Sequence, residues 1–316
     1  MNLAVLKMNL KFLGTKLMHN FKQTFSRVLK MVHQHLSDRF DGHGNIPKPG
    51  PRPKLSDAAV MALSLSSEIL SIDSENRLFT YLRQYPKTIP ALIDRSGYNV
   101  RRRKLFSFIE SLRQSIVQEL NLAPSVFIID TMPLPVCKIA RAKRSKVCKH
   151  TFETAPDIGF CAAQQTYFHG YKLHSVCTAQ GVFTLFDLSK ASVHDIHYLP
   201  DVKEHLKHAI LLGDKGYLSE EIQIDLFTSA RINLQTPMRA NQKNYVKQPF
   251  ILRKSRKRIE TLFSQLCDQF MIQRNYAKTL GGFKTRILSK ITALTISQLF
   301  NHQNQKNLNL IKYAFA

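Results

Sequence analysis

The sequence predicts an α/β protein in which a mixed β-sheet is flanked by helices and preceded by a mainly helical N-terminal region. Short apolar runs bounded by turn residues, such as Val126 to Ile129, have the length and composition of buried strands. Apolar residues at intervals of three and four mark helices before and between these runs. Strand and helix signals alternate from residue 123 onward, which is the order expected of an α/β sheet.

Changes in composition divide the 316 residues into five predicted segments. They are a basic amphipathic helical segment at 1–40, a linker at 41–54, a helical region at 55–122, an α/β domain at 123–300 and a tail at 301–316. The first segment carries lysines among apolar residues and has no Asp or Glu before Asp38, which is typical of a helix that lies on DNA or packs on a partner. A transit peptide or a membrane-surface helix has the same pattern. Closely spaced prolines and glycines indicate the linker.

Three helices are expected in the region 55–122. Their predicted ranges are 56–70, 73–85 and 96–120, and Ser56-Asp57 and Asp73-Ser74 cap the first two. The third carries a basic run made of Arg101, Arg102, Arg103 and Lys104. Short helices followed by a basic helix are typical of helix-turn-helix-like DNA-binding regions, although such a run also occurs on solvated helix faces.

The α/β domain is expected to follow the order strand, hairpin, helix, strand, helix, strand, helix. The ranges are 126–129 for the first strand, 171–178 and 182–188 for the hairpin, 196–208 for a helix, 210–212 for a strand, 220–229 for a helix and 231–236 for the last strand. The hairpin turns at Gly181. The last helix contains Glu260, because apolar residues around it recur at helical spacing.

Three acidic residues have the settings of metal ligands. Asp130 and Asp214 each follow an apolar strand, which places a carboxylate at the rim of the sheet, and Glu260 lies on the last helix. Neighbouring carboxylates raise each other's pKa, and a divalent cation removes that conflict. Taken singly, the two aspartates are also explained as turn residues and Glu260 as a surface partner of Arg256. Their joint occurrence favours a metal site.

The charge of the chain indicates a polyanionic partner. Lys and Arg number 46 against 22 Asp and Glu, which gives a formal net charge of +24. No stretch reaches the roughly 18 apolar residues of a membrane span, so nucleic acid is favoured over a membrane. The five cysteines form no paired Cys-x-x-Cys pattern and are expected to be reduced thiols in a cytoplasmic protein.

Three motifs resemble those of DDE transposases of bacterial insertion sequences, in particular the family numbered nine-eighty-two. They are Ile129-Asp130-Thr131, Gly213-Asp214-Lys215-Gly216-Tyr217 and Arg256 followed four residues later by Glu260. The second motif is the most specific of the three. Supporting stretches lie at 169–174, 191–195 and 259–266, and the resemblance extends over about residues 55–300.

The resemblance implies an RNase H-like catalytic domain at 123–300 that cuts DNA at the ends of the element and joins the freed 3′ hydroxyl to target DNA. Asp130, Asp214 and Glu260 would form the catalytic triad and bind Mg²⁺, with Mn²⁺ as a substitute. Two ions suit phosphodiester chemistry, because they stabilise both the entering and the leaving oxygen. The implied partners are the terminal inverted repeats and target DNA, bound by a homodimer in the bacterial cytoplasm, in association with the nucleoid.

Further cations are expected to contact DNA phosphates beside the active site. These are Lys215 and, in the basic stretch 243–258, Arg253, Lys254, Arg256, Lys257 and Arg258. The same acids and cations also fit a metal-dependent nuclease or resolvase that does not join strands. A third hypothesis is a non-catalytic DNA-binding descendant of such an enzyme.

Overall fold

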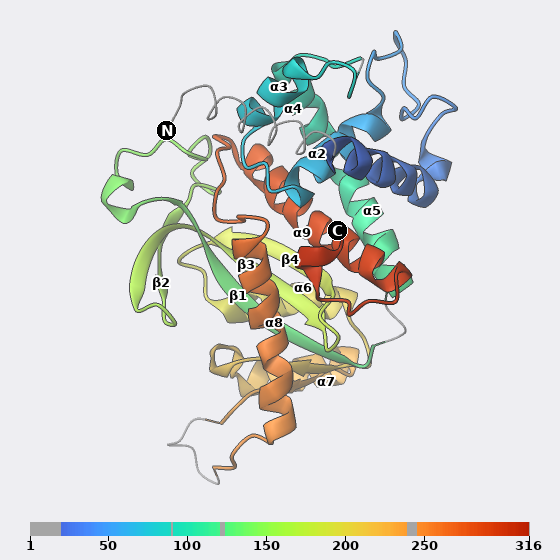
Figure 1. Cartoon of the computed structure of the whole chain (residues 1–316). Helices are drawn as coiled ribbons and strands as arrows, with labels where there is room; N and C mark the ends of the chain where they lie inside the picture. The colour runs from blue at the N-terminus through green and yellow to red at the C-terminus, as the bar shows by residue number, and fades with distance from the viewer. Residues whose placement is uncertain (1–19, 90, 121–123, 239–244, 316) are drawn as a thin grey trace, which may run out of the picture.

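The structure is a computed structural model that describes residues 20–89, 91–120, 124–238 and 245–315 (Figure 1). Its strands are β1 (Val126–Cys137), β2 (Asp157–Cys161), β3 (Thr166–Thr178), β4 (Phe183–Lys190), β5 (Ile210–Leu212) and β6 (Asn233–Gln235). Its main helices are α2 (Asp57–Ile69), α3 (Glu75–Gln84), α4 (Arg95–Lys104), α5 (Phe106–Leu120), α6 (Leu199–His205), α7 (Glu220–Ala230), α8 (Phe250–Asp268) and α9 (Leu280–Gln303).

The strands form one mixed sheet. β1 lies between β3 and β5, antiparallel to β3 and parallel to β5, and β6 pairs in parallel with the outer edge of β5. β3 is long enough for two strands on its other edge, with β2 pairing along 166–170 and β4 along 171–177. The order β4, β3, β1, β5, β6, in which the first three strands pair antiparallel and the last three pair parallel, is the RNase H-like arrangement that the resemblance implies, and β2 is added to it at the edge of β3. The predicted fold class is therefore confirmed.

Helices cover both faces of this sheet. On one face, Ile128 of β1 and Leu212 of β5 share a core with apolar residues of α8 and α9. On the other face, Phe127 and Ile129 of β1 pack with residues of α6 and α7. Successive side chains of a strand point to opposite faces, so the apolar run at the start of β1 supplies both cores. This double burial is why that run shows no polar alternation.

A third core joins the N-terminal helices to α9, which lies beside α2 and α5 (Figure 1). Leu288, Ile296 and Leu299 of α9 are buried together with Leu63 of α2 and Leu112 of α5. The predicted division between 55–122 and 123–300 therefore crosses a shared hydrophobic core. The helical region rests on the last helix of the α/β part and is held in a fixed position against it.

Several predicted elements differ from the structure. The single helix expected at 96–120 is wrong, because the buried Leu105, with φ −89° and ψ 10°, separates α4 from α5. β1 continues to Cys137 instead of ending at 129, since β3 pairs with it along that length. Neither β2 nor α9 was expected. The middle of α9 is buried on all sides, so it lacks the amphipathic stripe by which helices are recognised.

The N-terminal segment predicted at 1–40 lies partly outside the described residues. Residues 20–35 are helical, and Phe21, Val28 and Val32 pack in the core shared with α9. The predicted linker at 41–54 contains neither helix nor strand. Within the part of the chain that the structure describes, no helix has the length and apolarity required to cross a membrane.

Candidate active site

Two of the predicted acids lie at the same level of neighbouring strands, Asp130 within β1 and Asp214 two residues past the end of β5. The parallel register pairs Ile128 of β1 with Leu212 of β5, and Asp130 and Asp214 each follow two residues later. Asp130 does not lie past the end of its strand, as expected, but within β1 opposite Ser175 of β3. Among the described residues, Asp130 has no strand neighbour on the side of β5, because β5 ends at Leu212 whereas β1 continues to Cys137.

Asp130 lies in a setting that opposes its ionisation. Burial raises the pKa of Asp130 to about 7, and the negative charges of Asp214 and Asp195 act in the same direction. The backbone N–H of Thr131, which donates to Oδ1 of Asp130 over 2.8 Å, and the charge of Arg256 oppose this rise in pKa. A bound cation would stabilise the ionised carboxylate against both burial and like charge.

The turn after β5 holds Asp214 in place. The backbone N–H of Gly216 donates to Oδ1 of Asp214 over 2.8 Å, and a Cβ at Gly216 would lie 3.0 Å from that oxygen. A Cβ at Gly213 would lie 3.1 Å from the ring of Tyr217. The two glycines of this motif therefore allow the carboxylate and the ring to approach the backbone closely.

Tyr217 lies near the two aspartates. Its side chain is fully buried, and its hydroxyl has no hydrogen-bond partner among the described residues. Burial raises the pKa of this hydroxyl well above its ordinary value, and the charges of Asp195, Asp130 and Asp214 add to the effect. The phenol thus stays protonated and lies close to three carboxylates.

Asp195 is a third acid that sequence reasoning gave no role. It begins the short helix η3 (Asp195–Tyr198), and Nζ of Lys172 on β3 lies 2.8 Å from its Oδ1. The same ammonium group donates to the carbonyl oxygen of Val193 over 2.9 Å. The only sequence signal for Asp195 was its place in the stretch 191–195, which had merely supported the resemblance.

Glu260 lies on α8, which packs against β1. Its side chain is exposed, whereas the neighbouring Ile259 is buried in the core beneath the sheet. Arg256, one turn earlier on the same side of α8, is near enough for its charge to lower the pKa of Asp130. Arg256 is thus the residue of α8 whose charge acts on Asp130.

The donor set of the site fits a divalent cation with oxygen ligands. Asp130 and Asp214 supply carboxylates, and the buried hydroxyl of Ser175, beside Asp130, has no partner among the described residues. Mg²⁺ prefers a few carboxylates combined with water and phosphate oxygens. Among the residues that the structure describes, no three His, Cys, Asp or Glu side chains are grouped as a complete metal site.

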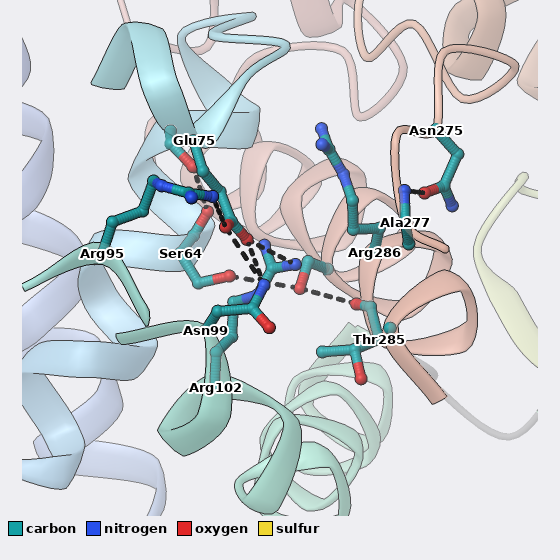
Figure 2. A network of polar contacts seen from close by, with 12 residues as sticks. Ser64, Glu75, Arg95, Asn99, Arg102, Asn275, Ala277, Thr285 and Arg286 are labelled. Carbon is teal, nitrogen blue, oxygen red and sulfur yellow. Dashed lines mark hydrogen bonds and ion pairs between the residues drawn. The ribbon is translucent and has the colours of Figure 1, made fainter. Parts of the chain in front are cut away.

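The basic run of α4 divides into two pairs. Arg101 forms an ion pair with Asp57 and donates to the carbonyl oxygen of Leu55. Arg102 is 2% exposed and lies 3.1 Å from Glu75 (Figure 2). Both arginines are thus engaged in ion pairs that connect the N-terminal helices, and their contact with DNA stays a prediction. Arg103 and Lys104 are exposed.

The other predicted DNA-binding cations lie along α8 and the turn after β5. Lys215, Arg253, Lys254 and Lys257 are exposed, while Arg256 and Arg258 are half-buried. Arg258 packs against Gly181 in the turn between β3 and β4. Part of the basic stretch 243–258 falls outside the described residues, which begin again at 245.

A second basic segment was missed. The connection from β1 to β2 carries six exposed cations, which are Lys138, Arg141, Lys143, Arg144, Lys146 and Lys149. Phe152, which follows them, is 88% exposed. The density of cations in this short stretch was a visible sequence signal for contact with phosphates.

Comparison with known proteins identifies the family. A family model described as "Transposase DDE domain" matches residues 121–296, which is more than half of the chain. No curated protein matches it. A solved structure described as "Mos1 transposase paired-end complex with left transposon end" is similar over 83% of each chain, at 13% identity and a TM-score of 0.22, which is too low to support an argument. The match of the family model shows that this chain belongs to the family of transposases with a DDE domain.

Proposed function

We propose that this protein is a metal-dependent transposase that cuts DNA at the ends of an insertion sequence and joins the freed 3′ hydroxyl to target DNA. The observation that carries the proposal is the pairing of β1 with β5, which sets Asp130 and Asp214 at the same level in a chain of the DDE family. Two adjacent carboxylates beside a cationic helix are suited to binding both divalent ions and phosphate oxygens.

Asp130, Asp214 and Glu260 are the proposed metal ligands. Glu260 is included because it lies on the same side of α8 as Arg256, whose charge reaches Asp130. Bound Mg²⁺ would supply Lewis-acid activation of the attacking oxygen and charge stabilisation on the leaving oxygen. The chain itself orients the first two carboxylates through the backbone N–H groups of Thr131 and Gly216.

The cations around the acids are proposed to hold the DNA backbone. Arg256 is proposed to bind the phosphate next to the bond that is cut, because its charge acts on Asp130 from α8. The exposed cations of α8, together with Lys215, Arg103 and Lys104, would extend this contact along the duplex. Joining requires that two element ends are handled together, so we propose a homodimer on DNA within the bacterial cytoplasm.

The test is a cleavage and joining assay on labelled DNA that carries the ends of the element, with Mg²⁺, Mn²⁺ or EDTA. The wild-type chain should nick and join in a metal-dependent manner. Asp130→Asn, Asp214→Asn and Glu260→Gln should each abolish both products while DNA binding persists. Asp201→Asn and Glu221→Gln, which change exposed acids on α6 and α7, are the matched controls.

Three results would contradict the proposal in different ways. Nicking without joined products would indicate a nuclease or resolvase that uses the same acids. Specific binding without cleavage in either metal would indicate a non-catalytic DNA-binding descendant. Full activity of Glu260→Gln alone would remove Glu260 from the site and leave the two aspartates as the metal ligands.

A further inference from the structure

A cavity of about 510 Å³ lies between the N-terminal helices and the first turn of α9. It is lined from one side by the start of α3 and by α4, and from the other by residues 276–279 and α9. Figure 2 shows Arg95, Asn99 and Arg102 of the N-terminal helices gathered around Glu75, with Arg286 of α9 standing apart from them. Segments far apart in the sequence thus build one cavity.

The cavity is strongly cationic. Its charged side chains are one carboxylate, Glu75, and five cations, which are Arg95, Arg102, Arg103, Lys278 and Arg286. Glu75 is already engaged, because Asn99 donates to both of its oxygens over 2.9 and 3.0 Å and Arg102 lies 3.1 Å away. Among the described residues, Arg103 and Lys278 form no ion pair and both are exposed. Arg286 is paired with the buried Glu68, so the positive charge that faces the opening comes from Arg95, Arg103 and Lys278.

The positive end of a long helix points into the same cavity. α9 has 24 residues, and its N-cap Thr279 accepts a hydrogen bond from the backbone N–H of Gly282 over 3.3 Å. Gly282 lines the cavity, and a Cβ there would lie 3.8 Å from Cδ of Arg103. The side chain of Arg103 thus extends from α4 over the start of α9, where the helix dipole favours an anion.

Two buried donors in the wall lack a partner. The Nε atoms of Arg102 and Arg286 are buried without a hydrogen bond to any described residue, and the two residues are 2% and 5% exposed. Because these two atoms are fully buried, an anion in the cavity does not reach them. The other nitrogens of the two groups are engaged within the protein, those of Arg102 with Glu75 and those of Arg286 with Glu68 and the carbonyl oxygen of Asp73. The exposed Arg103 and Lys278 are therefore the cations that an anion in the cavity would contact.

We propose that this cavity binds a backbone phosphate of DNA between α4 and the N-terminus of α9. The inference rests on the proposed function for the identity of the polyanion. The exposed Lys104 continues the cationic surface of α4. Because α9 also packs against the sheet, one phosphate held here fixes the DNA relative to both the N-terminal helices and the catalytic aspartates.

The test is the salt dependence of DNA binding by the full chain. Binding is measured without metal in the Asp214→Asn background, so that no cleavage interferes. The variant Arg103→Gln/Lys278→Gln removes two exposed charges and leaves the buried arginines intact. Lys306→Gln/Lys312→Gln, at exposed C-terminal positions, removes the same charge away from the cavity. Thermal unfolding of each variant verifies that the fold is unchanged.

The cavity variant should bind DNA about tenfold more weakly at physiological salt. The slope of log affinity against log salt should fall by about one, equally on end DNA and on an unrelated duplex, because phosphate contacts carry no sequence information. The control variant should change neither. If the slope of the cavity variant equals that of the wild type, the cavity does not bind DNA, even if the wild type cuts DNA. If the slope is reduced but the wild-type chain never cuts DNA, the cavity binds DNA and the proposed function is wrong.

A second measurement, the thermal stabilisation by inorganic phosphate, distinguishes a DNA phosphate from a free phosphate ion as the ligand of the cavity. If the variant loses thermal stabilisation by inorganic phosphate but keeps the wild-type slope on DNA, the cavity binds a free phosphate and the assignment to DNA is wrong. Loss of both responses supports the DNA phosphate.

Discussion

Glu68 and Lys290 form a buried ion pair whose disruption should destabilise the whole fold. Nζ of Lys290 lies 2.6 Å from Oε2 of Glu68 and donates to the carbonyl oxygen of Phe270 over 2.6 Å. The side chains of Lys290 and Glu68 are 0% and 2% exposed. Arg286 lies 3.6 Å from the other oxygen of Glu68. The pair connects α2 to α9 inside the core that joins the N-terminal helices to the rest of the protein.

The change Glu68→Gln keeps the shape of the side chain but leaves two buried cations without their counter-charge. Burial, with the charges of Arg286 and Arg102, already lowers the pKa of Lys290 although Glu68 raises it, so loss of the carboxylate drives this lysine toward its neutral form. Once Lys290 has become neutral, the loss of its counter-charge costs no more. Deprotonating a lysine with an ordinary pKa of about 10.4 at pH 7 costs roughly 4.6 kcal/mol, so the contribution of Lys290 to the destabilisation does not exceed this value. We therefore expect a loss of about 3 to 5 kcal/mol in the free energy of unfolding.

Urea unfolding monitored by circular dichroism measures this loss. Lys203→Met is the matched control, because Lys203 lies 2.8 Å from Asp225 but the two side chains are 24% and 52% exposed, and we expect at most about 1 kcal/mol there. The difference in unfolding free energy between the wild type and Glu68→Gln should shrink between pH 7 and pH 9. In this range the unfolded variant still holds the proton of Lys290 that the folded variant has lost, so the stability of the variant rises with pH. A deficit as small as that of Lys203→Met would refute the reasoning.

Three further predictions concern the turn after β5, the buried histidine and the β2 strand. Gly216→Ala places a Cβ 3.0 Å from Oδ1 of Asp214, so cleavage of end DNA should fall on the order of 10²-fold, whereas Gly281→Ala, with open space around its Cβ, should leave it unchanged. Burial lowers the pKa of His174 to about 4, so the folded state takes up its proton later than the unfolded state. Wild-type stability should therefore decline relative to His174→Gln by about 3 kcal/mol as the pH falls from about 6.5 to about 4, as measured by urea unfolding, and parallel pH profiles would contradict this. Gly159→Ala directs a Cβ to 2.2 Å from the carbonyl oxygen of Ala191, so β2 should detach from β3 and become sensitive to limited proteolysis. Gly42→Ala is the control, because a Cβ there has no atom of the described residues within 4 Å, and this variant should resist proteolysis as the wild type does.

The sequence by itself determined the elements whose signals are local. The apolar run before Asp130, the glycine turn around Asp214 and the helical spacing around Glu260 each lie within one turn or strand, and the structure has a strand, a turn and a helix at those places. The mixed α/β class followed from the alternation of such signals. The transposase family followed from the three motifs, and the family model confirms it.

Only the tertiary structure decided which of these residues meet. The parallel pairing of β1 with β5 brings Asp130 to Asp214, whereas on α8 it is Arg256 whose charge acts on Asp130, and Glu260 is exposed. Asp195 became visible as a neighbour of Asp130 because η3 packs against the turn after β5. Neither result is encoded in a local pattern, since strand pairing and helix placement depend on how distant faces pack.

The same reason explains the cations and the last helix. Arg101 and Arg102 differ from Arg103 and Lys104 only through partners on other helices, which a run of four basic residues does not reveal. α9 escaped notice because helix amphipathicity signals a single buried face, and this helix is buried all round. Its polar residues are matched by groups far away in the chain, such as Glu68 for Lys290, 222 residues apart. Periodicity and capping are local and can be seen in a sequence, whereas ion pairs and shared cores exist only once the chain has folded.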